Sequence, residues 1–211
     1  MGILFEPLDA LLSSRSKVRL LRVLIPAVQP VSGREAARLA RVARVPAARS
    51  LEELVDLGIL QRQATASQYL YRVNPRHQLT EPLAALFAAE EQRWVHLRDE
   101  LRQALEAAGL LPSVAALVLF GSNVRRDARP GSDLDLLAVV KNEPAVDPVR
   151  DALLNVGEVI RNQLGLCVSP LVLVAERAVE RFREGGPLMR EILEEGRTML
   201  GRPFHELVGV G

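Results

Sequence analysis

The sequence has very little cysteine and no long apolar run. Cys167 is the single cysteine among 211 residues, so the chain cannot form an internal disulfide framework. No uninterrupted apolar stretch approaches the roughly 20 residues that a membrane-spanning helix needs. The first residues also lack the basic and then apolar pattern of a secretory signal. We therefore expect a cytoplasmic protein with no membrane partner, and we expect Cys167, which has apolar neighbours, to lie in the core.

Net charge is also nearly absent, but its distribution is uneven. Residues 1–77 contain 12 Lys and Arg against 6 Asp and Glu, a net +6, whereas residues 78–211 contain 15 against 20, a net −5. Together these give the whole-chain charge of +1. A basic segment ahead of an acidic one predicts that the first third of the chain meets a polyanion. The length allows one large domain or two small ones.

Two apolar segments in the second half of the chain enclose a short polar loop. The first segment, residues 117–120, ends in Gly121 and Ser122, which predicts a buried strand that runs into a tight turn. The second segment begins with Asp133 and Asp135 and continues as an apolar strand to residue 140. Residues i and i+2 of a strand project from the same face, so the two carboxylates should lie side by side.

Two neighbouring carboxylates repel each other unless a cation lies between them. Mg²⁺, or alternatively Mn²⁺, suits this pair because it takes oxygen ligands and leaves positions for substrate phosphates. Gly121 would let the backbone approach a ligand closely, and Ser122 would open a short helix whose free N–H groups face a phosphate. The alternative interpretation is an ordinary turn followed by a solvated Asp-x-Asp.

The segment FGSNVRRDARPGSDLDLLAVV resembles the nucleotidyltransferases of the DNA polymerase beta superfamily, and it is most similar to their minimal nucleotidyltransferase branch. The resemblance covers about the last hundred residues. It implies that Asp133 and Asp135 are the catalytic, metal-binding carboxylates, and that the acceptor is a hydroxyl, which some antitoxin members find on a partner protein. It also implies that the nucleoside triphosphate is bound by Gly121, Ser122, Arg125, Arg129 and Ser132, in a loop that also contains Arg126.

One part of that family's pattern is missing. Active members usually carry a third carboxylate on the strand after the intervening helix, where it helps to hold the metal and can act as a base. Here the corresponding strand, residues 166–174, contains no Asp or Glu, and the expected position falls near Ser169. Glu176, just beyond the strand, is the alternative donor. Two aspartates with triphosphate oxygens suffice for one Mg²⁺ but are few for a two-metal mechanism.

The basic first third shows three helical patterns followed by a hairpin pattern. We expect Ser16 to cap the first helix and Ser32 to open a capping box with Glu35 at the start of the second. The third helix has Pro46 in its first turn and ends at Gly58. The strands of the hairpin are expected at residues 59–62 and 69–73.

This order of elements resembles the winged helix-turn-helix domains of bacterial and archaeal regulators, and SLEELVDLGILQR resembles their transition from recognition helix to wing. The resemblance implies that the third helix enters the major groove of duplex DNA. On a period of 3.6 residues Arg49 lies opposite the apolar stripe, which makes it the first candidate for a base contact. The other candidates are Arg44 and Ser50 on the helix, and Arg62 and Arg72 on the hairpin.

Three acidic residues oppose this interpretation. Glu52, Glu53 and Asp56 share the exposed face with Arg49, and they would repel phosphates that came close. The alternative is a winged helix that serves protein contacts or dimerisation.

A long helical pattern covers residues 81–108, with Trp94 in its apolar stripe. At about 1.5 Å per residue this helix would be roughly 40 Å long. It is expected to connect two domains, and a homodimer could form through it or through the winged helix.

These patterns predict an α+β protein in three parts. Residues 1–77 form a winged helix-turn-helix, residues 78–108 a linker helix, and residues 109–211 a nucleotidyltransferase-like domain with a small mixed sheet flanked by helices. Two functions are open. The first is an enzyme that binds a magnesium–nucleoside triphosphate and transfers a nucleotidyl group to a hydroxyl, for example one on a partner protein. The second is a transcriptional regulator whose nucleotidyltransferase domain is a weak or inactive nucleotide sensor or scaffold.

Overall fold

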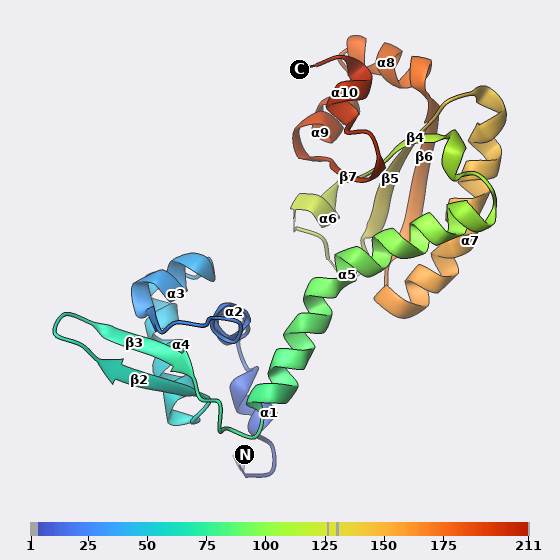
Figure 1. The fold of residues 1–211 in the computed structure, drawn as a ribbon. Coiled ribbons are helices and arrows are strands. Elements are labelled where there is room, and N and C mark those ends of the chain that lie inside the picture. Colours follow the sequence, from blue (N-terminus) through green and yellow to red (C-terminus); the bar gives the residue numbers. More distant parts are fainter. Residues whose placement is uncertain (1–3, 126, 130, 211) are drawn as a thin grey trace. The chain divides into compact units, whose positions relative to one another are not determined.

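The computed structural model describes residues 4–125, 127–129 and 131–210. The chain separates into two units, Met1–Glu91 and Gln92–Gly211 (Figure 1). The boundary falls inside helix α5, Thr80–Ala107, which corresponds to the long helix expected over residues 81–108.

Both ends of α5 are anchored by apolar side chains. Leu83 and Phe87 are buried in the core of the first unit, whereas Leu101 and Leu105 are buried in the core of the second. Trp94 packs against the second core as well. One helix therefore contributes to two separate cores, and the homodimer expected through it stays a prediction.

The first unit combines short helices with a small antiparallel sheet ahead of α5. The helices are α1 Pro7–Leu11, α2 Arg15–Leu24, α3 Gly33–Leu39 and α4 Arg44–Asp56. The strands are β1 Val31–Ser32, β2 Leu60–Ala64 and β3 Tyr69–Val73, in the order β1-β3-β2. Three helices followed by a β-hairpin were predicted from the sequence, whereas α1 was not. The buried residues of α2, α3 and α4 form one core with Ile59 and Leu60.

Serine side chains begin two of these helices. Ser32 accepts a hydrogen bond from the Glu35 backbone N–H at 3.2 Å, which confirms the predicted cap of α3. The predicted cap of α2 was wrong: Ser14, not Ser16, accepts from the Lys17 backbone N–H at 3.2 Å. Ser14 has the extended backbone that a capping residue needs, whereas Ser16 already lies inside the helix.

The second unit is built on a four-stranded mixed sheet. Its strands are β4 Val114–Phe120, β5 Asp133–Val140, β6 Cys167–Val174 and β7 Arg197–Gly201, in the order β6-β5-β4-β7. β5 and β6 are parallel, and the other two pairs are antiparallel. The helical elements after α5 are η1 Leu111–Ser113, α6 Ser122–Arg125, η2 Glu143–Ala145, α7 Val146–Leu164, α8 Ala175–Arg183, α9 Pro187–Glu195 and α10 Phe204–Val208. The predicted mixed sheet with helices is confirmed, and α10 is an addition.

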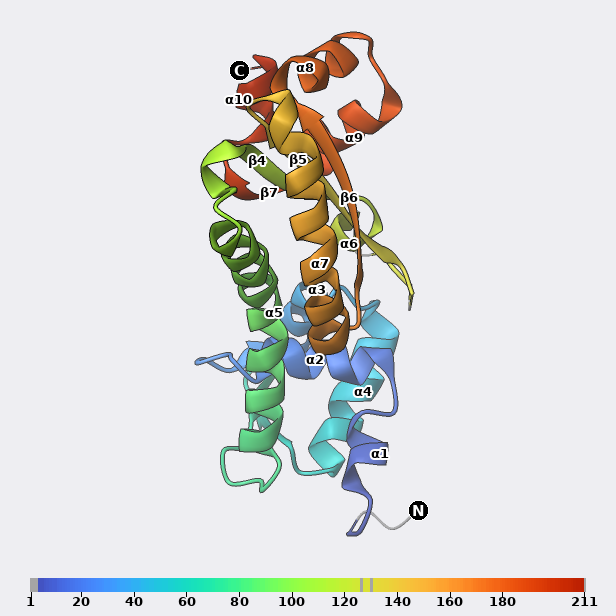
Figure 2. The ribbon, with the colours of Figure 1, turned by 90° about the vertical axis from the view of Figure 1, so that its right-hand side faces the viewer.

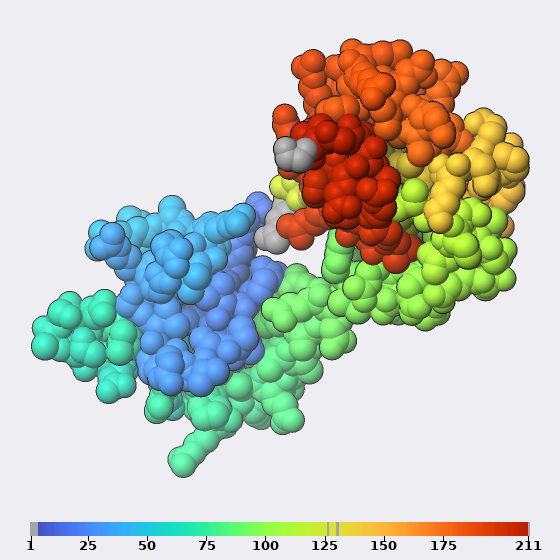
Figure 3. All heavy atoms as spheres, turned by 45° about the horizontal axis from the view of Figure 1, so that its top comes forward, coloured from blue at the N-terminus to red at the C-terminus, as the bar shows by residue number. Residues whose placement is uncertain are grey.

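Alternation along the strands divides the side chains of the sheet between two cores. Leu134 and Leu136 of β5 pack in a core with residues of α5 and α7, and Figure 2 shows α7 running alongside the strands. Leu137 and Val139 pack on the other face with residues of α8, α9 and α10. Figure 3 shows the outer surface of α8 and α10 in orange and red. The odd-numbered residues of β5, including Asp133 and Asp135, therefore face the layer of α8, α9 and α10.

No helix within the described part of the chain is both long and apolar enough to cross a membrane.

Candidate functional site

Asp133 and Asp135 begin β5 on the face that carries α8, α9 and α10. The side chain of Asp133 is exposed and that of Asp135 is half-buried, while Leu134 between them is buried in the opposite core. The two carboxylates therefore project from the same face, which is the arrangement that the period of two predicted.

Gly121 brings the backbone against Asp135. This glycine is buried and has a left-handed φ of +77° at the end of β4. A Cβ atom added here would overlap Oδ2 of Asp135 and lie 3.2 Å from its Cγ. Phe120, the residue before Gly121, pairs with Asp135 across the two strands. Only glycine allows both the turn and this close approach, so Gly121 fixes the carboxylate and the turn relative to each other.

The charge of Asp135 is poorly compensated. Burial is the largest cause that raises the pKa of this carboxyl above its ordinary value, and the negative charges of Asp133 and Glu191 raise it further. Arg125 acts in the opposite direction but does not outweigh them. The folded chain therefore holds an excess of negative charge here, which a bound cation would relieve.

Arg125, the last residue of α6, is held by acidic residues. Its Nη1 pairs with Glu191 and lies 3.6 Å from Oε2 of Glu195, both on α9, and its Nε lies 3.4 Å from Oδ2 of Asp127. The hydrogen bond with Glu191 is the largest cause that raises the pKa of Arg125. Glu191 was not predicted from the sequence, because α9 reaches the site through tertiary packing and no spacing in the sequence reveals that approach.

The loop after α6 is closed by its own hydrogen bonds. The backbone N–H of Arg129 donates to Oγ of Ser132, and the N–H of Ser132 donates to the Arg129 carbonyl, each at 2.9 Å. The Arg129 side chain is exposed. Asn123 donates through Nδ2 to the Asp133 carbonyl at 2.7 Å, which ties α6 to β5. Arg126 lies outside the described residues.

Ser169 lies directly beside Asp135. The parallel pairing of β5 and β6 sets Asp135 opposite Ser169, and the side chain of Ser169 is exposed on the same face. The position predicted for a third carboxylate is thus next to Asp135 and carries a hydroxyl.

Glu176 cannot replace the missing carboxylate. β6 continues for five residue steps from Ser169 to Val174, about 17 Å at roughly 3.3 Å per residue, before α8 begins with Ala175 and Glu176. Glu176 therefore lies toward the opposite end of the sheet from Asp135.

Cys167 is exposed, so the prediction that it lies in the core was wrong. It begins β6, in register with Asp133 and on the same face as Ser169. Its apolar neighbours in the sequence, Leu166 and Val168, pack against the core on the opposite face of the sheet.

The residues at this site fit a divalent cation only in part. Asp133 and Asp135 offer carboxylate oxygens, the ligands that Mg²⁺ and Mn²⁺ prefer. Among the described residues, however, no group of three or more His, Cys, Asp and Glu side chains could hold a metal ion by itself. A cation at this pair would need further oxygen ligands, and phosphate groups are ligands of that kind.

In the first unit, α4 presents a mixed face to solvent. Arg44 and Arg49 are exposed, and the exposed fraction of Val45 is 80%. Ser50 is only 6% exposed, on the same side as the buried Leu51 and Leu54, so we leave it out of the candidate DNA-contacting surface. Val45 was missed, because nothing in the sequence separates it from the core residues of the helix.

The hairpin arginines have partners. Arg62 pairs with Glu52, and its Cζ lies 4.5 Å from the centre of the Tyr69 ring. Arg72 donates through Nε to Oε1 of Gln61 at 2.9 Å. Tyr71 donates to Oε1 of Glu52 at 2.8 Å, and burial, followed by this hydrogen bond, raises the pKa of Tyr71 to about 12. The negative charge of Glu52 is therefore compensated by Arg62 and the Tyr71 hydroxyl inside the first unit.

Comparison with known proteins identifies the second unit. Residues 98–198, a little under half of the chain, match the family model described as nucleotidyltransferase domain. The match includes Gly121, Asp133, Asp135 and Ser169, and it does not extend to α1, α2, α3 or α4. No curated protein is significantly similar to the chain in sequence.

Similarity to solved structures is partial. A toxin–antitoxin complex with AMP-PNP is 14% identical, with a TM-score of 0.35, over 53% of this chain and 81% of that one. A mutant of the MntA-HpeT toxin–antitoxin is 12% identical, with a TM-score of 0.35 and the same coverage. Human N-acetylserotonin methyltransferase with SAM is 17% identical, with a TM-score of 0.29, over 51% of this chain and 36% of that one. TM-scores at this level are too low to carry an inference.

We predict that Gly121→Ala damages this site beyond its effect on the backbone. A non-glycine residue at a left-handed φ costs about 1–2 kcal/mol, and the overlap with Asp135 should displace the carboxylate as well. Gly165→Ala is the matched control, because Gly165 has φ +71° and a Cβ there would meet no atom within 4 Å. Chemical denaturation should show a larger loss of stability for Gly121→Ala than for the control. Equal losses for both variants would contradict the contact.

Proposed function

We propose that the second unit binds a nucleoside triphosphate together with one divalent cation, Mg²⁺ or Mn²⁺. The observation that carries this proposal is the pair of carboxylates on one face of β5, Asp133 and Asp135, with Asp135 against the Gly121 turn, within the stretch that matches the nucleotidyltransferase family. The excess negative charge at Asp135 favours a cation there, and the cation in turn would accept phosphate oxygens as its remaining ligands.

In this proposal each loop residue has a separate task. Gly121 and Ser122 contact the β- and γ-phosphates, and Ser132 keeps the loop closed behind them. A bound cation would neutralise part of the negative charge of the phosphates. Arg125 and Arg129 add positive charge to the triphosphate, with Arg125 leaving its α9 partners, Glu191 and Glu195, to do so.

We propose further that transfer to a hydroxyl acceptor is slow. A base beside the metal pair would take the proton of the attacking hydroxyl, and the position in register with Asp135 holds Ser169, which is a poor base at neutral pH. The resemblance to minimal nucleotidyltransferases supports a partner protein as the acceptor. A chain that holds nucleotide and transfers it slowly suits a sensor as well as an enzyme.

The first test is binding of ATP and the other triphosphates with and without Mg²⁺ by calorimetry. We expect binding only with the cation, because two carboxylates repel bare phosphate, and we expect the double variant Asp133→Asn, Asp135→Asn to lose it. The control is Asp151→Asn with Glu158→Gln, which removes two exposed carboxylates from α7 on the other face of the sheet. Unchanged binding by the Asp133, Asp135 variant would remove the proposed site.

The second test restores a carboxylate at Ser169. Because Ser169 is exposed beside Asp135, Ser169→Asp should fold and supply a base and a metal ligand. We expect labelled-nucleotide incorporation into candidate partner proteins to rise about 10-fold or more over wild type. Ser169→Asn is the uncharged control, and melting temperatures should be recorded for both variants. Rapid incorporation by wild type that Ser169→Asp leaves unchanged would contradict the proposed defect.

A second candidate function is favoured by the first unit. We propose that α2, α3, α4 and the β2–β3 hairpin form a winged helix-turn-helix that binds duplex DNA through α4. The net +6 of residues 1–77 supports a polyanionic partner. The exposed Arg44, Val45 and Arg49 on α4 supply base-reading and thymine-methyl contacts, and Arg62 and Arg72 supply phosphate contacts. Together with the nucleotidyltransferase domain, this makes transcription regulation linked to nucleotide binding the proposed role.

The DNA proposal predicts marked salt dependence and a specific role for Arg49. A duplex selected from a random pool should bind more weakly as salt rises, because phosphate contacts release counterions. Arg49→Ala should weaken the selected duplex by ~1–3 kcal/mol and a scrambled duplex much less. Arg15→Ala is the control, because it removes an exposed arginine from the start of α2. Equal gel shifts for wild type and Arg49→Ala would exclude α4 as the reading helix.

A further inference from the structure

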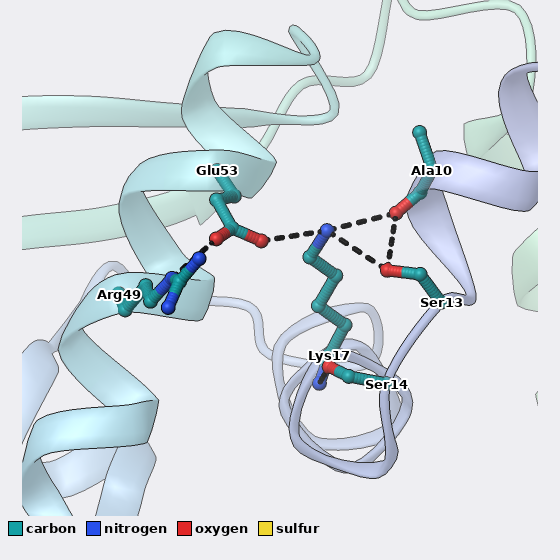
Figure 4. Close-up of polar contacts among 6 residues, drawn as sticks. All are labelled: Ala10, Ser13, Ser14, Lys17, Arg49 and Glu53. Carbon is teal, nitrogen blue, oxygen red and sulfur yellow. Dashed lines mark hydrogen bonds and ion pairs between the residues drawn. The ribbon is translucent and has the colours of Figure 1, made fainter. Parts of the chain in front are cut away.

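Lys17 is the charged residue that the first unit buries, with an exposed fraction of 6%. It lies in α2, and its ammonium group reaches three acceptors (Figure 4). These are the Ala10 carbonyl at 2.9 Å, Oγ of Ser13 at 3.1 Å and Oε2 of Glu53 at 2.8 Å. An ammonium has three donors, so every donor of Lys17 has a partner, as a buried charge requires.

Glu53 connects this buried ammonium to the surface of α4. One carboxylate oxygen, Oε2, pairs with Lys17, and the other, Oε1, accepts from Nε of Arg49 at 2.9 Å. The hydrogen bond with Lys17 is the first cause, and that with Arg49 the second, that lowers the pKa of Glu53, so its carboxylate stays ionised. Lys17, Glu53 and Arg49 thus form a continuous series of ion pairs, which Figure 4 shows. The series leads from the buried Lys17 to the exposed Arg49.

This series of ion pairs removes the objection that the acidic residues of α4 raise against DNA binding. Glu53 lies between two cations, so the three residues together carry +1. Glu52 is engaged by Arg62 and by the Tyr71 hydroxyl. Two of the three carboxylates that would repel phosphates are therefore compensated inside the unit.

These ion pairs also leave the two terminal nitrogen atoms of Arg49 accessible. The side chain of Arg49 is 84% exposed, and its contact with Glu53 uses Nε. Its two terminal nitrogen atoms make no contact with another described residue in the same network. Those two nitrogens are the atoms that reach O6 and N7 of a guanine in the major groove. A guanidinium held at Nε loses less rotational freedom on binding than an unrestrained one.

We propose that Lys17 and Glu53 are positioning residues that hold Arg49 for a two-nitrogen contact with guanine in duplex DNA. This inference rests on the proposed DNA binding of the first unit. The buried Lys17 holds the carboxylate of Glu53 through Oε2, and Oε1 of Glu53 holds Nε of Arg49. Neither Lys17 nor Glu53 contacts DNA itself.

The sign of the effect of Glu53→Gln separates positioning from simple electrostatics. Removing a negative charge from a DNA-facing helix strengthens binding if charge alone matters. Positioning predicts the opposite for the selected duplex: Glu53→Gln should weaken it about 3- to 10-fold, while binding of a scrambled duplex is unchanged or stronger. Asp56→Asn is the matched control, because it removes an exposed carboxylate from the same helix, and it should leave the ratio of the two affinities unchanged.

A double-variant cycle then tests whether Glu53 acts through Arg49. Affinities of the selected and scrambled duplexes should be measured at one salt concentration for wild type, Glu53→Gln, Arg49→Ala and the combination. We expect Glu53→Gln to have no further effect on the selected duplex once Arg49 is alanine. Additive losses, or a gain in specific affinity like that of a plain charge removal, would overturn the positioning role while leaving DNA binding intact. Absence of preferential DNA binding by wild type would overturn both.

Loss of folding must be kept apart from loss of positioning. Glu53→Gln leaves the buried Lys17 ammonium with a weaker partner, which lowers the melting temperature. Adding Lys17→Met removes that charge and keeps an apolar side chain of similar length. The combined variant should recover the melting temperature but not the specificity ratio. Recovery of both would assign Lys17 and Glu53 a purely structural role and overturn the inference.

Discussion

The close approach of Asp135 to the backbone of Gly121 is the constraint on which the candidate site of the second unit depends. No side chain fits at Gly121, so the end of β4, the start of α6 and the start of β5 hold one arrangement. That arrangement places a half-buried carboxylate beside Asp133 and within the field of Glu191, and it raises the pKa of Asp135. Folding therefore accepts unfavourable electrostatics at one spot. A cation bound as proposed would relieve this cost, so the same geometry that destabilises the empty site would favour a positive ligand.

The two units treat acidic residues in opposite ways. On α4, Glu53 lies between Lys17 and Arg49, and Glu52 is held by Arg62 and Tyr71. At the start of β5 the carboxylates outnumber Arg125, the one arginine among the described residues that acts on Asp135, and Arg125 is shared with α9. Both differences agree with the proposed functions, since a surface that binds a polyanion needs its own carboxylates compensated, whereas a site that binds a cation needs them uncompensated. The net charges of the two parts of the sequence, +6 and −5, reflect this difference only coarsely.

Local periodicity predicted the elements and the shared face of Asp133 and Asp135, because alternation in a strand depends on neighbouring residues alone. The resemblance to the nucleotidyltransferase family implied that the position of a third carboxylate falls near Ser169, and the register of β5 and β6 sets this residue beside Asp135. The features that the sequence did not reveal depend on packing between distant segments. Glu191 approaches from α9, and Lys17 finds Glu53 across two helices. Ser50 follows Arg49 by one residue, a turn of about 100° that carries its side chain from solvent into the core.

Ser169 decides what the proposed site would do with a bound nucleotide. A carboxylate there would join Asp133, Asp135 and Glu191, so four negative charges instead of three would lie around this spot. Without a ligand, a site with this added carboxylate would be less stable than the site with Ser169. With two cations bound, it would be equipped for nucleotidyl transfer. The serine removes one charge and one base together, so it favours a site that one cation and a triphosphate can fill and that has little means to activate a hydroxyl. A serine at position 169 in place of a carboxylate thus lowers both the electrostatic cost of the empty site and the expected rate of nucleotidyl transfer. This combination is expected where the bound nucleotide matters more than its turnover.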